Sequence, residues 1–250
     1  MLSNKTGKKI RDAVSDYVVF DLETTGVNCS TDDVIEISAV KVASGEITEE
    51  FSTLVNPGRT IPFYATEVNG ITDDMVADAP AFEAALSDFL AFAGDSVLVG
   101  HNIDRFDLRF LYRDVEKYWG RTLGNDYIDT LEIAQLYLPE LSHHKLTDLA
   151  DHYGIDADGA HRALNDCRMN QMVFEELKKE MENPSEAARN VRKCPRCGNI
   201  LRKRSGRYGD FWGFLGMYGV SGLQIYGKDL IYVFYIRENP ILANVINCRF

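Results

Sequence analysis

Three β-prone segments open this chain of 250 residues and constrain its fold more than any other feature. Residues 17–22 form an apolar, β-branched run, and residues 34–42 and 47–55 alternate between apolar and polar side chains. The sequence Ser-Gly-Glu at 44–46 is typical of a hairpin turn, so three antiparallel strands should begin the fold. The patterns that follow predict two more short strands, at 96–100 and 127–129. They predict helices at 80–92, 104–118, 130–138, 146–153 and 161–181. This order predicts an α/β fold in which helices flank a mixed β-sheet.

A break after the last predicted helix divides the chain. Asn-Pro-Ser at 183–185 interrupts the helical pattern and indicates a domain boundary. We expect an N-terminal extension and a main domain, followed by a basic linker that holds a Cys-x-x-Cys sequence and an aromatic, glycine-rich tail. Their predicted bounds are 1–14, 15–183, 184–207 and 208–250. The last part should form a small irregular or β-rich appendage.

Charge is distributed unevenly between these parts. Residues 1–188 carry a formal charge of −19 and residues 189–250 a charge of +8, which together give the net −11 of the whole chain. Residues 189–207 alone hold eight basic side chains and no acidic one. An acidic body normally argues against nucleic-acid binding. That argument fails if some of the carboxylates hold divalent cations.

The sequence favours a reduced, cytoplasmic environment. Its five cysteines are odd in number and lack the regular spacing of a disulfide-bonded domain, so we expect them to be reduced. No apolar stretch follows the first lysines, so no signal peptide is predicted. The longest charge-free run, 211–227, contains five glycines and is too short for a membrane span. We therefore expect no membrane partner.

Two carboxylates end the first predicted strand. Asp21 and Glu23 lie two residues apart in an extended segment and should point the same way, while Leu22 points into the core. Adjacent carboxylates repel each other unless a cation lies between them, and Mg²⁺ and Mn²⁺ prefer such oxygen ligands. An acidic strand end in water is the alternative reading.

Further acidic residues follow the strand at 96–100. Asp104 and Asp107 are three residues apart on the predicted helix and hence near one face. Asp104 is placed to cap the helix start, which leaves Asp107 as the better metal ligand. Alternatively, both are helix-start carboxylates favoured by the helix dipole.

The third candidate group opens the last predicted helix. His161 and Asp166 are five residues apart and share one helix side only loosely. If His161 precedes the helix, it can lie on a loop while Asp166 faces bound metal ions.

Together these segments resemble the three motifs of the DEDDh 3′–5′ exonucleases, in particular the epsilon-subunit type of bacterial DNA polymerase III. Asp-Leu-Glu-Thr-Thr-Gly begins at residue 21, His-Asn-x₃-Phe-Asp at residue 101 and His-Arg-Ala-Leu-x-Asp at residue 161. The resemblance spans about residues 15–182 and implies a ribonuclease H-like fold. It makes His161 the general base, and it implies metal ligation by Asp21, Glu23, Asp107 and Asp166.

The resemblance also implies a reaction. The family hydrolyses the 3′-terminal phosphodiester and releases nucleoside 5′-monophosphates with the help of two Mg²⁺ or Mn²⁺ ions. The substrate would be the 3′ end of DNA, preferably single-stranded, in proofreading or repair. The residues expected to bind it are Thr24, Thr25, Gly26, Asn102 and Phe106. No polymerase domain fits in 250 residues, so proofreading would require a separate polymerase subunit.

Two alternatives remain open at this point. An RNA-trimming exonuclease of the same fold would share these motifs, because they build a metal site and do not sense a 2′-hydroxyl. A non-catalytic nucleic-acid-binding or polymerase-scaffold module is the other alternative. The presence of all five catalytic positions argues against it.

The basic linker contains a pair of cysteines at a spacing found in zinc sites. Cys194 and Cys197 have the spacing of a zinc knuckle, and the stretch to Gly213 resembles the four-cysteine ribbon of bacterial type I topoisomerases. Phe214 and Val220 stand where that pattern requires further cysteines. Either a degenerate ribbon or a shift of the reading frame near residue 213 accounts for this, and zinc binding is in doubt.

Overall fold

The structure, a computed structural model, describes residues 2–157, 162–194, 200–206 and 209–214. His161, Cys197 and Val220 lie outside these ranges. The chain divides into two compact units, Met1–Pro184 and Ser185–Phe250, and each is described by itself.

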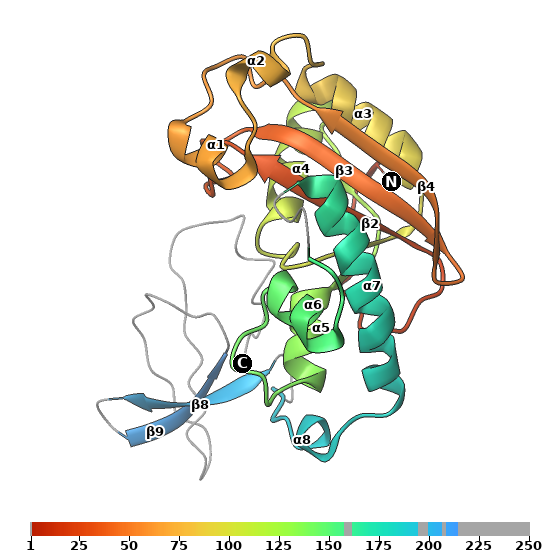
Figure 1. The fold of residues 1–250 in the computed structure, drawn as a ribbon, viewed down its shortest axis with the longest axis vertical. Coiled ribbons are helices and arrows are strands. Elements are labelled where there is room, and N and C mark those ends of the chain that lie inside the picture. The colour runs from red at the N-terminus through yellow and green to blue at the C-terminus, as the bar shows by residue number, and fades with distance from the viewer. Residues whose placement is uncertain (1, 158–161, 195–199, 207–208, 215–250) are drawn as a thin grey trace. The chain divides into compact units, whose positions relative to one another are not determined.

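A five-stranded mixed sheet forms the centre of the first unit, in the order β4-β3-β2-β5-β7 (Figure 1). The strands β2, β3 and β4 are antiparallel, whereas β5 and β7 run parallel to β2. Their bounds are Tyr17–Thr24, Val34–Ala43, Glu46–Leu54, Val97–Gly100 and Tyr127–Asp129. The predicted mixed sheet and its opening antiparallel strands are confirmed.

Alternate side chains of β2 pack on opposite faces of this sheet. Val18, Phe20 and Leu22 join a core cluster with residues of α3 and α4. Tyr17 and Val19 join a second cluster with residues of α5, α6 and α7. These helices are Phe82–Ala93, Asp107–Trp119, Thr130–Tyr137, Leu146–Tyr153 and Ala163–Glu182. Because side chains alternate along a strand, Asp21 and Glu23 fall on the face that α7 covers.

Two short helices lie between β4 and α3. These are α1, Phe63–Asn69, and α2, Asp73–Val76, and they enclose a small third cluster with Ile35 and Ile71. Thr72 precedes α2 as predicted, but its side chain makes no capping hydrogen bond.

The start of α4 differs from its prediction. The helix begins at Asp107 and not near residue 104, and Phe106 occupies the N-cap position. Asn102 takes a left-handed conformation with φ of 65°, a conformation that asparagine tolerates better than most residues, and it turns the chain after β5. Asp104 therefore does not cap the helix. Its carboxylate accepts hydrogen bonds from Lys9 Nζ at 2.9 Å and from the Tyr127 hydroxyl at 2.8 Å.

The N-terminal segment lies along the edge of the sheet. Its strand β1, Leu2–Ser3, pairs with β6, Thr122–Leu123, and Lys9 forms a parallel bridge with Tyr127 of the edge strand β7. The contacts with β6 and β7 show that this extension completes the first unit. The sequence did not indicate β1 or β6.

The described part of the second unit is small and holds a two-stranded sheet, one strand of which lies in the segment predicted as a linker. Of the tail predicted to be irregular or β-rich, only residues 209–214 are described. Helix α8, Glu186–Arg189, is capped by the Ser185 side chain, and β8, Leu201–Gly206, pairs with β9, Gly209–Phe214. The Arg192 guanidinium lies 4.7 Å from the centre of the Trp212 ring. Cys194 is buried, and zinc binding stays a prediction. Across the described residues, no helix is long and apolar enough to cross a bilayer.

Candidate active site

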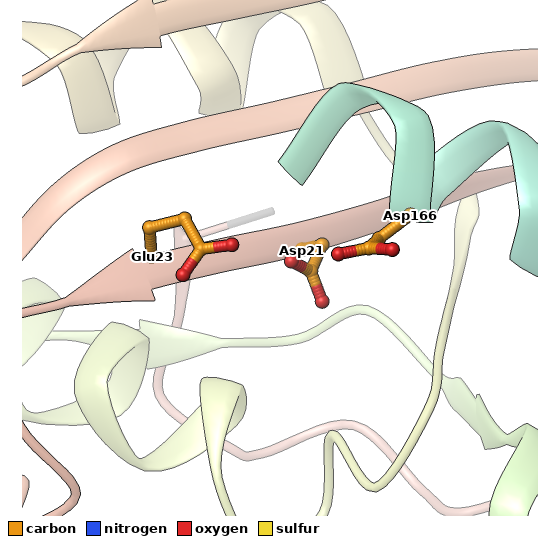
Figure 2. Close-up of side chains that lie close together, drawn as sticks. All are labelled: Asp21, Glu23 and Asp166. Atoms are coloured by element: carbon orange, nitrogen blue, oxygen red, sulfur yellow. The ribbon is translucent and has the colours of Figure 1, made fainter. Parts of the chain in front are cut away.

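Three carboxylates converge where β2 ends. Oxygen atoms of Asp21, Glu23 and Asp166 lie within 4.8 Å of one another (Figure 2). Asp21 and Glu23 share one face of β2, and Asp166 comes from the first turn of α7, which packs against that face. The period of the strand and the packing of the helix together place these groups side by side.

Asp107 lies beside this group but does not belong to its closest set. It is the first residue of α4 and is 2% exposed. The pairing of β2 with β5 ends at Val19, so the backbone N–H of Leu22 lies beyond the last pair of that ladder. Asp107 accepts a hydrogen bond from this N–H at 3.2 Å. The carboxylate is thereby fixed against the strand between the Asp21 and Glu23 positions.

Burial and mutual repulsion disfavour the charged forms of these carboxylates. Burial first, and then the charges of Asp107 and Glu23, raise the pKa of Asp21 well above its usual range. Burial and the Asp166 charge raise the pKa of Glu23 to about 8, although a hydrogen bond from Asn69 of α1 opposes the shift. Burial also raises the pKa of Asp107 to about 7. A bound cation would relieve this repulsion.

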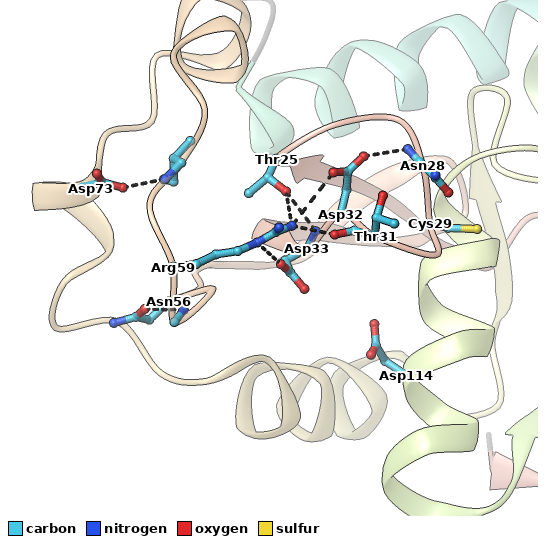
Figure 3. Close-up of polar contacts among 12 residues, drawn as sticks. Thr25, Asn28, Cys29, Thr31, Asp32, Asp33, Asn56, Arg59, Asp73 and Asp114 are labelled. Atoms are coloured by element: carbon cyan, nitrogen blue, oxygen red, sulfur yellow. Dashed lines mark hydrogen bonds and ion pairs between the residues drawn. The ribbon is translucent and has the colours of Figure 1, made fainter.

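Thr24 ends β2, and Thr25 and Gly26 begin a tightly held loop, in which Thr25 is labelled in Figure 3. The Thr24 hydroxyl donates to Gly26 O at 2.7 Å, and the fully buried Thr25 hydroxyl accepts from Asp33 N at 3.0 Å and from Arg59 at 3.2 Å. A Cβ atom on Gly26 would lie 2.5 Å from the Asp32 carboxylate, so any larger residue there would displace the Asp32 side chain. These contacts shape the loop, and substrate binding by its residues stays a prediction.

Two arginines from other parts of the chain hold this loop in place. Arg59, between β4 and α1, pairs with Asp33 at 2.5 Å and donates to Thr31 O at 2.7 Å. Arg113 of α4 donates to the carbonyl oxygens of Cys29 and Asp32. The segment after Glu23 is therefore preorganised by contacts to two other elements.

The second predicted segment is held by a buried aspartate. Asp129 ends β7 and accepts hydrogen bonds from Asn102 N at 3.0 Å and from Leu131 N at 3.0 Å. It thus joins the turn at Asn102 to the start of α5. Phe106 packs edge-on against Phe110, with ring centres 5.3 Å apart, and is half-buried.

His161 lies outside the described residues, so its predicted role as general base is untested. It directly precedes Arg162, the N-cap residue of α7. The three carboxylates that lie closest together, Asp21, Glu23 and Asp166, were all named as candidate ligands from the sequence, and Asp107 lies beside them.

The sequence of residues 18–174 matches the exonuclease (RNase_T) family. The chain belongs to this family. This exonuclease is 37% identical over 183 residues to DNA polymerase III subunit epsilon of Aquifex aeolicus, a match that covers 72% of this chain and 90% of that protein. It is 40% identical over 171 residues to DNA polymerase III PolC-type of Clostridium perfringens. That match covers 67% of this chain and 12% of the much longer relative.

Solved structures agree on the architecture of this exonuclease. Exonuclease X in complex with 5′ overhanging duplex DNA superposes with a TM-score of 0.55 at 26% identity, over 68% of this chain and 95% of that one. E. coli exonuclease I in complex with a dT13 oligonucleotide gives a TM-score of 0.58 at 18% identity, over 68% and 42% of the two chains. The second likeness concerns the fold alone. The predicted nuclease class and ribonuclease H-like fold are confirmed.

Two buried carboxylates near this site, Asp129 and Glu36, were not predicted as site residues. Asp129 carries the signal of an N-cap, because an acidic residue stands between a short strand and a helix. Glu36 carries a weaker signal, since it interrupts an otherwise buried strand with a charge. The structure places Glu36 directly opposite Glu23 in the β2–β3 ladder.

Proposed function

We propose that this chain is a metal-dependent 3′–5′ exonuclease that hydrolyses the 3′-terminal phosphodiester of DNA, preferably single-stranded, to nucleoside 5′-monophosphates. The convergence of Asp21, Glu23 and Asp166 within 4.8 Å is the observation that carries this proposal. The DNA polymerase III and exonuclease relatives support DNA as the substrate class.

The donor set fits hard divalent cations. Mg²⁺ and Mn²⁺ bind carboxylate oxygens, and the pKa values of Asp21 and Glu23 are raised first by desolvation and then by the negative charge of their neighbours. Asp21, Glu23 and Asp166 would hold the ions together with the adjacent Asp107. Two cations bound there would lower the pKa of a water molecule and neutralise the phosphodiester.

The remaining steps belong to side chains of this protein. His161 would take the proton of the attacking water, because a neutral imidazole can accept a proton near neutral pH. Thr24, Thr25 and Gly26 would border the terminal nucleotide, because they directly follow Glu23 in the chain. Asn102 and Phe106 would line the path of the strand.

The names of the relatives also suggest a protein partner and a cellular process for this chain. One relative is named as a subunit of DNA polymerase III, and the PolC-type relatives are polymerases of which this chain matches about 12%. We propose that this chain acts in the cytoplasm on the 3′ end of DNA, with a separate polymerase as its partner in proofreading. A role in repair without that partner is the other setting.

Digestion of 5′-labelled single-stranded DNA and of an RNA of the same sequence tests the proposal. Purified protein is incubated with Mg²⁺, Mn²⁺ or EDTA, beside the variant Asp21→Ala. We expect a descending ladder on DNA that requires both metal and Asp21. Faster digestion of RNA would assign RNA trimming, and folded protein that cleaves neither would indicate a scaffold role.

A further inference from the structure

Glu36 is a buried carboxylate that the proposed reaction does not use. It lies in the middle strand of the three antiparallel ones and is 2% exposed. Its Cα is paired with that of Glu23, and residues directly opposite in such a ladder present their side chains to the same face. A charged side chain is rarely buried to this degree without a partner.

The partners of Glu36 lie at the beginning of α7. Arg162 Nη2 donates to Glu36 Oε1 at 3.1 Å, and the backbone N–H of Ala163 donates to Oε2 at 3.4 Å. Arg162 Nε lies 3.5 Å from the same Oε2. One carboxylate therefore binds the guanidinium of the N-cap residue and the first N–H of the helix, where negative charge is favoured.

Arg162 continues this connection into the candidate metal site. Its carbonyl oxygen accepts hydrogen bonds from Asn165 N at 2.8 Å and from Asp166 N at 3.0 Å. Glu36 thus reaches the backbone of Asp166 through a single residue. A shift of Arg162 would move the turn that aims the Asp166 carboxylate at Asp21 and Glu23.

We propose that Glu36 is a positioning residue that, by binding Arg162 and Ala163 N, fixes the first turn of α7 and so places Asp166 for cation binding. This inference rests on the proposed function only for the measurements of DNA hydrolysis; hydrogen exchange and Mn²⁺ affinity test it independently. Residues that orient metal ligands are commonly worth about 10- to 100-fold in metal affinity or activity.

A second ion pair on the same helix provides a matched control. Arg168 Nη2 lies 2.6 Å from Glu50 Oε2, with the two side chains 42% and 38% exposed. It joins α7 to β4, as the Glu36 pair joins it to β3. Exposed pairs contribute little because water and salt screen them. Glu50→Gln should therefore leave cation binding and turnover within about twofold of the parent.

Direct ligation of the cation by Glu36 is the competing explanation. Under that explanation, Arg162→Gln would free Glu36 and remove a positive charge beside the carboxylates, so Mn²⁺ would bind more tightly. Positioning predicts the opposite, because the variant loses the contact that fixes Asp166. The direction of the change in Mn²⁺ affinity for Arg162→Gln separates the two.

The experiment compares the full chain with Glu36→Gln, Arg162→Gln, Glu50→Gln and the double variant at positions 36 and 162. Amide hydrogen exchange of residues 162–167, Mn²⁺ affinity by calorimetry, and kcat and KM on single-stranded DNA are measured. We expect faster exchange in both single variants at positions 36 and 162, with Mn²⁺ affinity and kcat about tenfold or more lower and KM within about twofold. The double variant should be no worse than either single one.

Unchanged exchange in Glu36→Gln, or tighter Mn²⁺ binding by Arg162→Gln, would overturn the proposal. A parent protein that binds Mn²⁺ but hydrolyses no nucleic acid would refute the proposed function instead. In that case the exchange and affinity measurements still decide the role of Glu36.

Discussion

Replacing Glu23 with glutamine should stabilise the metal-free protein. The pKa of Glu23 rises from 4.5 to about 8, so folding at higher pH requires either burial of the charge or uptake of a proton. Well below pH 4.5, Glu23 is protonated in both the folded and the unfolded protein, and it imposes no cost on the free energy of unfolding. As pH rises toward 8, the unfolded chain loses its proton first and stability falls by about 1.4 kcal/mol per pH unit.

The sum of this penalty is about 3 kcal/mol at pH 7 and about 5 kcal/mol above pH 8. Glu23 keeps some contact with water, and we expect about half of the upper figure, 2–3 kcal/mol, to appear in measurement. Glutamine has nearly the same shape and no charge, so it removes the penalty. The gain in unfolding free energy should be small at pH 5 and largest at pH 8.5.

Urea unfolding in EDTA at pH 5, 7 and 8.5 measures this gain. Glu46→Gln, at an exposed position where β4 begins, is the control and should change stability little at any pH. Saturating Mg²⁺ should reverse the order of the two proteins at pH 8.5, because a ligand at 100 times its Kd stabilises by about 2.7 kcal/mol and the variant has lost a ligand. If Glu23→Gln were no more stable than the parent in EDTA at pH 8.5, the reasoning from buried repulsion would be refuted.

Three further substitutions have expected outcomes. Asp21→Asn should lower turnover on single-stranded DNA at least about 1000-fold while the melting temperature in EDTA stays equal or rises, and a loss of folding by circular dichroism would contradict this. His161→Ala should keep its Mn²⁺ affinity by calorimetry but lose about 100- to 10,000-fold in kcat, and weakened Mn²⁺ binding would assign the histidine another role. Gly100→Ala should destabilise the fold by at least about 1–3 kcal/mol in urea, since its Cβ would lie 1.9 Å from Ile103 Cγ2, and an unchanged midpoint would show that this turn can move.

The sheet could be predicted from the sequence because the alternation of a strand and the residues of a turn are local features, each contained within a few consecutive residues. Ser44 and Gly45 both take positive φ values, 53° and 84°, and the turn they form joins two strands of the expected alternation. The start of α4 was predicted less well. Its turn depends on Asn102, and Asp104 is held by Lys9 and Tyr127, which are distant in sequence.

In the candidate site, too, some positions follow from local sequence and others depend on contacts between distant parts of the chain. The shared face of Asp21 and Glu23 follows from strand period, and this pair was predictable. The approach of Asp166 depends on which face of β2 is covered by α7, and the place of Asp107 depends on an N–H group left beyond the end of β5. Glu36 was missed because its function depends on Arg162, more than 100 residues along the chain.

Hydrolysis of single-stranded DNA in ¹⁸O-water with Mg²⁺, followed by mass spectrometry of the products, tests whether this carboxylate site is a metal-dependent 3′–5′ exonuclease. We expect nucleoside 5′-monophosphates to be released in order from the 3′ end, each with one ¹⁸O atom on phosphorus from the attacking water. EDTA and Asp21→Asn should each abolish them. Internal oligonucleotide fragments, nucleoside 3′-phosphates or equal release in EDTA would contradict a metal-dependent 3′–5′ exonuclease at this carboxylate site.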